Sequence, residues 1–221
     1  MLYERYASMV TVPPRARKKR DLHAALIEAA ARVIATEGPA ALTLRRVADD
    51  VGTSTMAIYT NFGGMPELRR AVRREGFARL SRQLAELAET DDPVADLAMV
   101  GLAYYLNAIE EPHLYRVAFM EEPLDREDAA VGSEAFASLV RAIERCIASG
   151  RFREADATEL ANQFWALGHG VIALRLARLL STDEALRALD RGVLSLFRGY
   201  GDDPAAADRS LQRARTTRAR A

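Results

Sequence analysis

Side chains that hydrogen-bond phosphate are concentrated in one short stretch of the chain. Residues 43–62 read TLRRVADDVGTSTMAIYTNF. Hydroxyl, phenol and amide groups suit phosphate oxygens, as do the backbone N–H groups at helix N-termini. The side chains of this kind that we expect to anchor phosphate are Thr43, Ser54, Tyr59, Thr60 and Asn61. Together these groups could bind the phosphates of a nucleic-acid backbone.

The apolar spacing predicts two short helices that position these groups. Four residues fall at i, i+3, i+4 and i+7 of one helix face: Leu44, Val47, Ala48 and Val51. Thr43 can cap this helix and Gly52 can end it. Thr53 and Ser54 offer a second cap, and Ile58 and Phe62 point the next helix inward. The residues left facing outward are Thr55, Met56, Tyr59 and Thr60. Such a pair of helices is typical of the helix-turn-helix, whose second helix enters the DNA major groove, although an ordinary helical hairpin has the same periodicity.

The run from Val47 to Leu68 resembles the DNA-binding domain of TetR-family transcriptional regulators. That family continues from an alanine-rich first helix into the signature L-Y-x-x-F-x-x-K-x-x-L, where this chain reads IYTNFGGMPEL. Ile58 replaces the Leu, and Met65 replaces the usual Lys, which removes one expected phosphate cation. The similarity covers residues 21–77. It implies an all-α protein with a three-helix helix-turn-helix head and a larger helical ligand-binding and dimerisation body.

The resemblance also implies which side chains read bases. The family's base-reading positions correspond to Thr55, Met56 and Ala57; the first can hydrogen-bond bases, and the other two can contact thymine methyls. Arg45 and Arg46 can partly compensate for Met65. The expected DNA-binding residues are therefore Arg17, Lys18, Thr43, Arg45, Thr53, Ser54, Thr55, Met56, Ala57, Tyr59, Thr60 and Asn61.

Arg17 and Lys18, the first two of the expected DNA-binding residues, belong to an N-terminal segment, residues 1–20. Pro13-Pro14 argues against a helix there, so we expect a flexible basic arm that follows phosphates or enters a minor groove. A solvated tail is the alternative. The domain boundaries that we predict are a head over 21–65, a linking helix over 66–89, a helical body over 90–200 and a disordered Ala/Arg-rich tail over 201–221.

The body carries a second, weaker resemblance. The segment WALGHGVIAL, with Trp165, His169 and Gly170, is similar to the W-x-x-x-H-G signature of one TetR regulatory-domain subclass, and residues 103–120 are similar to its Tyr- and Pro-containing partner region. We expect a pocket for a small apolar or amphipathic effector, because such pockets combine aromatic walls with a few polar groups. The candidate lining residues are Tyr104, Tyr105, His113, Phe119, Phe136, Trp165 and His169. The alternative is that these are core or interface residues.

The C-terminal part of the body predicts a homodimer. A helix over 154–180 would be apolar on two faces, and both need cover. A second subunit can supply the second cover, together with the helix over 182–200. The candidate interface residues are Ile172, Leu176, Leu179, Leu186, Leu189, Val193, Leu196 and Phe197.

Composition narrows the classes of function. The 221 residues have zero net charge, but residues 1–64 carry +3, residues 65–200 carry −5 and residues 201–221 carry +2. Basic charge thus gathers around the expected DNA reader. Apolar runs are too short for a membrane span and the N-terminus does not resemble a signal peptide, so we expect no membrane contact and a cytoplasmic location.

Catalytic and metal-binding patterns are also missing from the sequence. One cysteine, Cys146, and the distant His113 and His169 lack metal-ligand spacing, so we expect no metal site. The sequence holds no G-x-S-x-G, P-loop or G-x-G-x-x-G motif, so we expect no enzyme and no cofactor. The prediction is a ligand-responsive repressor that binds a palindromic double-stranded DNA operator as a homodimer. The alternative is a helical ligand-binding or interaction module that has lost specific DNA binding.

Overall fold

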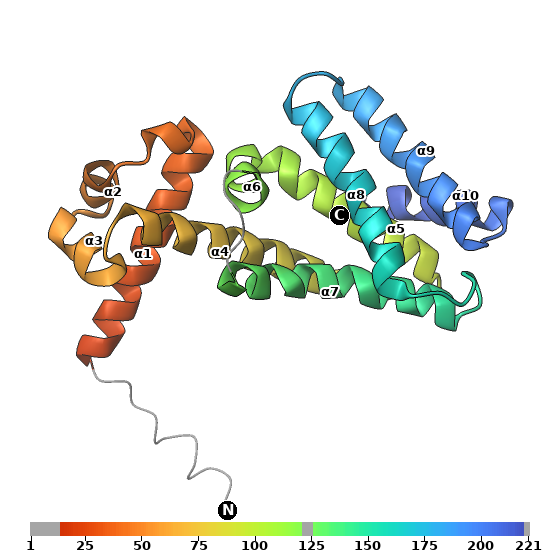
Figure 1. The fold of residues 1–221 in the computed structure, drawn as a ribbon, viewed down its shortest axis with the longest axis horizontal. Helices are drawn as coiled ribbons and strands as arrows, with labels where there is room; N and C mark the ends of the chain where they lie inside the picture. Colours follow the sequence, from red (N-terminus) through yellow and green to blue (C-terminus); the bar gives the residue numbers. More distant parts are fainter. Residues whose placement is uncertain (1–13, 121–125, 219–221) are drawn as a thin grey trace, which may run out of the picture. The chain divides into compact units, whose positions relative to one another are not determined.

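The computed structural model describes residues 14–120 and 126–218 and is helical throughout them, with ten α-helices, one short 3-10 helix and no strand in these ranges (Figure 1). The predicted all-α fold class is confirmed. The chain divides into two compact units, Met1–Val72, here called the head, and Arg73–Ala221, here called the body. The division falls within α4 (Met65–Ala85) rather than at residue 65.

The head is a three-helix cluster closed by the first turns of α4. Its elements are α1 (Pro14–Glu37), η1 (Pro39–Ala41), α2 (Leu44–Val51) and α3 (Thr55–Phe62). Apolar residues spaced for one face of each helix form the core, in which the most buried side chains are Leu26, Val33, Ile34, Val47, Ile58, Leu68 and Val72. Removal of this apolar surface from water drives the packing. The core fixes the orientation of α3, because Ile58 is completely buried.

The expected flexible arm is wrong for residues 14–20, because α1 begins at Pro14. Proline is favoured at the first position of a helix, where its missing N–H needs no partner and its fixed φ already matches the helix. Arg17 and Lys18 therefore lie on the first turns of a helix, and their side chains lie outside the described ones. Residues 1–13 also lie outside the described part of the chain.

The body consists of the rest of α4, α5 (Pro93–Glu110), α6 (Pro112–Phe119), α7 (Arg126–Ala148), α8 (Ala157–Leu176), α9 (Thr182–Tyr200) and α10 (Pro204–Arg218). Helix α5 packs against α7, α8 and α10, and α8 packs against α7 and α9. Side-chain caps stabilise the starts of several helices. At the start of α5, Asp92 Oδ1 accepts a hydrogen bond from the Ala95 N–H at 3.1 Å. A reciprocal Ser181–Glu184 capping box starts α9.

Helix α8 is shorter than the predicted helix over 154–180. At its start, Asp156 Oδ1 accepts from the Thr158 N–H at 2.8 Å, which supplies an N-cap that the apolar pattern did not reveal. At its end, Arg178 has a φ of 60°, a left-handed conformation that interrupts the helix before α9 begins. The predicted helix is therefore shortened at both ends, and the separately predicted helix over 182–200 is α9.

The predicted disordered tail is wrong for residues 201–218, because α10 is folded against α5 and α9 (Figure 1). One face of α10 presents Ala207, Ser210 and Ala214, each no more than 2% exposed. Alanine is the strongest helix former and its small side chain allows close helix approach. The low apolar content of the segment therefore reflects a helix that docks through small residues.

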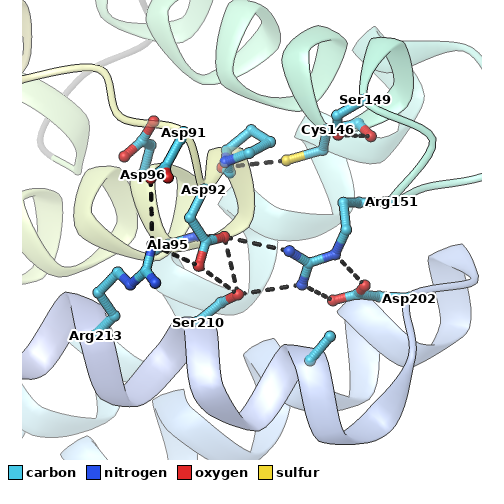
Figure 2. A network of polar contacts seen from close by, with 12 residues as sticks. Asp91, Asp92, Ala95, Asp96, Cys146, Ser149, Arg151, Asp202, Ser210 and Arg213 are labelled. Carbon is cyan, nitrogen blue, oxygen red and sulfur yellow. Dashed lines mark hydrogen bonds and ion pairs between the residues drawn. The ribbon is translucent and has the colours of Figure 1, made fainter.

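A buried polar network, consisting of Asp92, Arg151, Asp202 and Ser210 and here called the Arg151 network, joins α10 to the rest of the body (Figure 2). The Arg151 guanidinium donates to both carboxylate oxygens of Asp202, at 2.6 and 2.8 Å. It also donates to Asp92 at 3.3 Å, and Ser210 donates to Asp92 at 2.9 Å. The network ties the end of α7, the start of α5 and α10 together.

Cys146 lies beside this network and is a core residue. Its thiol donates to the Pro93 carbonyl at 3.3 Å, and burial raises the pKa of the thiol to about 12. A thiol with so high a pKa is a poor nucleophile near neutral pH. Over the described residues, no helix combines the length and the apolar character needed to cross a membrane.

Candidate nucleic-acid interface and ligand cavity

Side-chain caps begin both helices of the pair, Thr43 at the start of α2 and Ser54 at the start of α3. Thr43 Oγ1 accepts from the Arg46 N–H at 3.1 Å, and Ser54 Oγ accepts from the Ala57 N–H at 3.3 Å. Between them, Gly52 has a φ of 71°, a left-handed conformation that glycine adopts at little cost. Because each hydroxyl accepts from its helix, its own hydrogen remains available to donate. Both caps therefore present a donor where phosphate would approach.

The outer face of α3 presents apolar and polar side chains to solvent. Met56 is 68% exposed and Tyr59 is 51% exposed, whereas Ile58 on the opposite face is fully buried. Thr55 and Thr60 are also exposed. A methionine and a tyrosine displayed together on one short helix are characteristic of a surface that contacts a partner.

Three other predicted DNA-binding residues of this region are less open. Thr53 and Ala57 are half-buried. Asn61 is half-buried too: its amide donates to the Ala57 carbonyl at 2.7 Å, and its oxygen has no partner among the described residues. The Thr60 hydroxyl gives its single hydrogen to the Met56 carbonyl at 2.9 Å. Since phosphate oxygens only accept, Thr60 is not a phosphate donor in this conformation.

The two arginines at the start of α2 differ in their surroundings. The Arg45 side chain is 89% exposed and lies 3.9 Å from Asp49. Arg46 donates to Glu37 at 2.9 Å and to Asp50 at 3.4 Å, and the contact with Glu37 raises the pKa of the guanidinium. Arg45 is therefore accessible from solvent, whereas Arg46 holds α2 to the end of α1. Met65, in place of the family's lysine, is half-buried at the start of α4.

The body encloses a cavity of about 280 Å³, here called the first cavity, between α4, α5, α6, α7, α8 and α9. Four of the predicted ligand-binding residues line it: Tyr104, Phe119, Phe136 and Trp165. Further apolar walls that the sequence did not single out are Phe77, Leu80, Leu84, Val100, Leu139, Phe164 and Leu189. The polar side chains in the wall are Ser133, Asn162 and the Tyr104 phenol, and none of the described lining residues is charged. Such a surface suits an uncharged, largely apolar ligand.

Behind this wall lies a polar cluster centred on His169. The Tyr104 hydroxyl lies 2.8 Å from His169 Nδ1, Trp165 Nε1 donates to that hydroxyl at 3.3 Å, and the Tyr115 hydroxyl also contacts Nδ1. Burial lowers the pKa of His169 and raises that of Tyr104, which favours the neutral forms of both. A neutral imidazole that accepts at Nδ1 fits these contacts. Tyr115 was not predicted, although the resemblance of residues 103–120 included its position.

Three predicted ligand-binding residues do not line the first cavity. His169 belongs to the polar cluster described above. Tyr105 is only 1% exposed and lies in the main core of the body. His113 is half-buried near the start of α6. The aromatic character of these residues did not distinguish a cavity wall from other buried positions.

The predicted interface residues separate into two groups. Ile172, Leu189, Val193 and Phe197 are at most 6% exposed and belong to the core of their own chain. Those four side chains are not available to a partner, because they are buried within their own chain. Leu176, Leu186 and Leu196 are partly buried, whereas Leu179 is 71% exposed. Leu174, which was not predicted, is 43% exposed, so the open apolar surface lies at the end of α8.

Two family models match the chain. Residues 26–72 match the model described as bacterial regulatory proteins, tetR family, and residues 97–196 match the model described as tetracyclin repressor-like, C-terminal domain. The first match contains α2 and α3, and the second contains most walls of the first cavity. No curated protein sequence matches the chain.

Several solved structures share the fold. A protein of unknown function from Rhodococcus sp. RHA1 has 22% identity and a TM-score of 0.73 over 82% of this chain and 96% of its own. RolR in complex with resorcinol has 18% identity and a TM-score of 0.68, over 90% and 96%. SmeT, the repressor of the Stenotrophomonas maltophilia multidrug efflux pump SmeDEF, has 23% identity and a TM-score of 0.60, over 78% and 89%. Likeness at these identities shows the fold alone.

Proposed function

The chain belongs to the TetR family of transcriptional regulators, and we propose that it is a repressor that binds an inverted-repeat operator as a homodimer and leaves it when a small effector binds. Members of the family are typically ligand-responsive DNA-binding repressors and are generally non-enzymatic. The proposed setting is the cytoplasm, where double-stranded DNA is the partner of the head.

The observation that carries the proposal is the outer face of α3 together with its capped start. Thr55 and Met56 stand exposed at the N-terminal end of α3, the part of a recognition helix that meets base edges. The Ser54 cap and the Tyr59 phenol flank them with donors for phosphate. Base contacts would supply specificity and phosphate contacts would fix register.

Effector release requires two states of the dimer that differ in the distance between the heads. Two heads on one face of DNA read half-sites about 34–36 Å apart, or a larger distance set by whole turns. An effector shifts the population only by the difference between its affinities for the two states. The first cavity supports this role, since walls from α4, α5, α6, α7, α8 and α9 meet there and a ligand would contact all of them.

The chemistry of the cavity supports a small apolar or amphipathic effector. Its walls are aromatic and aliphatic, with a few neutral polar groups. A protein of the same fold, RolR, was solved with resorcinol bound, a small uncharged aromatic molecule. SmeT, another protein of this fold, is a repressor, which supports repression as the mode of action.

In vitro selection of DNA from a random pool tests the proposal. The wild-type protein is expected to enrich an inverted repeat, and a Thr55→Ala/Tyr59→Ala double variant is expected to enrich none. Ser195→Ala is the matched control, because it removes an exposed hydroxyl from the body and leaves the head unchanged. It should enrich the wild-type sequence.

If the folded wild-type protein enriches nothing at low salt, the repressor proposal fails and the helical ligand-binding or interaction module becomes the better description. Met65→Lys then distinguishes the reason. Recovery of DNA binding in that variant would trace the loss to the missing phosphate cation. Continued absence of binding would show that the recognition face itself does not read DNA.

A further inference from the structure

A second cavity, of about 230 Å³, lies between α5, α9 and α10 of the body. Most of its walls are apolar, including Leu102, Leu186, Val193, Leu211 and Ala214. It lies partly outside the residues matched by the family model, which end at 196, because α10 supplies one whole side. The cavity exists only because the C-terminal segment is folded.

The first and second cavities adjoin. Gly101 on α5 and Leu189 on α9 line both of them. The Gly101 backbone and the Leu189 side chain can separate the two cavities only by their own thickness. Leu189 is 6% exposed and is flanked by empty space on both sides, so a change of its rotamer alters the width of the junction.

The Phe164 ring packs directly against Gly101 at the junction. A Cβ atom at this position would lie 2.9 Å from Phe164 Cε1 and 3.1 Å from Phe164 Cζ. Phe164 lines the first cavity, so a methyl group on residue 101 would crowd the ring at the junction. Glycine is unfavourable inside a helix by about 1 kcal/mol relative to alanine, so its presence in α5 has a packing reason.

The wall of the second cavity carries an ion pair. Arg215 contacts the Asp190 carboxylate there, and the two are the charged residues in its wall. The pair is neutral as a whole and offers both donors and an acceptor. The first cavity, in contrast, has no charged lining residue among those described.

We propose that the two cavities form one elongated site for an uncharged chain-like molecule with a single polar end, such as an aliphatic alcohol or amide. The apolar chain extends from the first cavity past Gly101 into the second. A terminal hydroxyl donates to Asp190 and accepts from Arg215. A carboxylate would instead place a second negative charge beside Asp190, and this like-charge contact is unfavourable. This inference deepens the proposed effector site and rests on it.

Trp165 is the one tryptophan of the sequence and lines the first cavity, so its fluorescence reports binding there. Titrations with hexanol, octanol and decanol are expected to show roughly fourfold tighter binding for each added methylene, until both cavities are filled. Decanoate is expected to bind more weakly than decanol. Equal or tighter binding of decanoate would contradict the proposed polar end.

Two variants test the connection between the cavities. Gly101→Ala crowds the junction from α5, and Ala214→Leu fills the second cavity from α10. Both are expected to lose at least tenfold in decanol affinity, and Ala214→Leu is expected to keep the hexanol affinity, because residue 214 lines the second cavity and not the first. Ala205→Leu, an exposed position on α10, is the matched control and should bind all three alcohols as the wild type does.

The outcomes separate this inference from the proposed function. If hexanol binds but the affinity does not rise toward decanol, or if both variants retain the full rise, the joined site is refuted and the first cavity alone is the effector site. If no alcohol changes Trp165 fluorescence in the wild type, the elongated site is refuted as well. Selection of an operator is measured without effector, so it can succeed in either case.

Discussion

The Asp202→Ala substitution tests how α10 is held. The Asp202 side chain is 1% exposed and receives two hydrogen bonds from Arg151, whose side chain is 25% exposed. Removal of one partner of a fully buried ion pair costs about 3–5 kcal/mol, because the other charge remains buried. Arg151 keeps its 3.3 Å contact with Asp92 and part of its hydration, so we expect a loss of about 2–3 kcal/mol.

The assay is urea unfolding of the body, followed through Trp165 fluorescence. Asp91→Ala is the control: Asp91, just before α5, pairs with Arg213 of α10 at 3.3 Å, but its side chain is 92% exposed. Exposed pairs contribute about 0–1 kcal/mol, so this variant should lose less than about 1 kcal/mol. The contrast between the two aspartates isolates the effect of burial.

Limited tryptic digestion supplies a local readout, since α10 contains Arg209 and Arg213. Cleavage at these sites should accelerate in Asp202→Ala, because the helix opens more often when its main ion pair is lost. An unfolding free energy within 1 kcal/mol of the Asp91→Ala value, with unchanged digestion of α10, would refute the argument that the Arg151 network fastens this helix.

Three further predictions concern the head, the His169 cluster and the exposed end of α8. Tyr59→Phe should weaken binding to every DNA sequence alike, by about tenfold for one phosphate hydrogen bond, as measured by fluorescence anisotropy; loss confined to one sequence would contradict a phosphate role. Burial lowers the pKa of His169, so the unfolded chain binds a proton there more readily than the folded chain, and the thermal midpoint of the body should fall as the pH drops below 6.5. His169→Gln should make the midpoint less dependent on pH. An unchanged pH dependence in this variant would assign the effect to other groups. Leu179→Glu should convert a dimer to a monomer in analytical sedimentation and change the free energy of unfolding by less than about 0.5 kcal/mol, because Leu179 is exposed. Leu189→Ala, at a buried position, should instead lower the free energy of unfolding by about 2–4 kcal/mol. A dimer that survives Leu179→Glu would place the interface elsewhere.

The helix-turn-helix was accessible from sequence because its determinants are local. Thr43, Gly52 and Ser54 act on helix ends within a few residues, and the periodicity of Val47 and Ile58 defines which face is buried. Caps and periodicity involve neighbours in the chain, so they can be read in one dimension. The family resemblance added the functional meaning of the outer face, and the two family models confirm the membership.

The same local rules failed where two local signals competed. Pro13-Pro14 was interpreted as a helix breaker, but proline also begins helices, and α1 begins there. The helix predicted over 154–180 begins later, after the Asp156 cap, and ends earlier, before the left-handed Arg178. Neither residue interrupts the apolar pattern. Periodicity indicates which residues face a core and leaves the ends of a helix to individual side chains.

Long-range packing decided the rest. The sequence alone determined that the protein is all-α, that a capped recognition helix displays Thr55, Met56 and Tyr59, and that apolar stripes supply a large helical body. Only the tertiary structure decided that α10 folds, because Ala207 and Ala214 are buried by α5 and α9 and Asp202 by Arg151, which is far away in the chain. It also decided that Tyr104 lines a cavity while its neighbour Tyr105 lies in the core. Helical periodicity identifies apolar faces, but which partner covers a face depends on contacts between segments far apart in sequence.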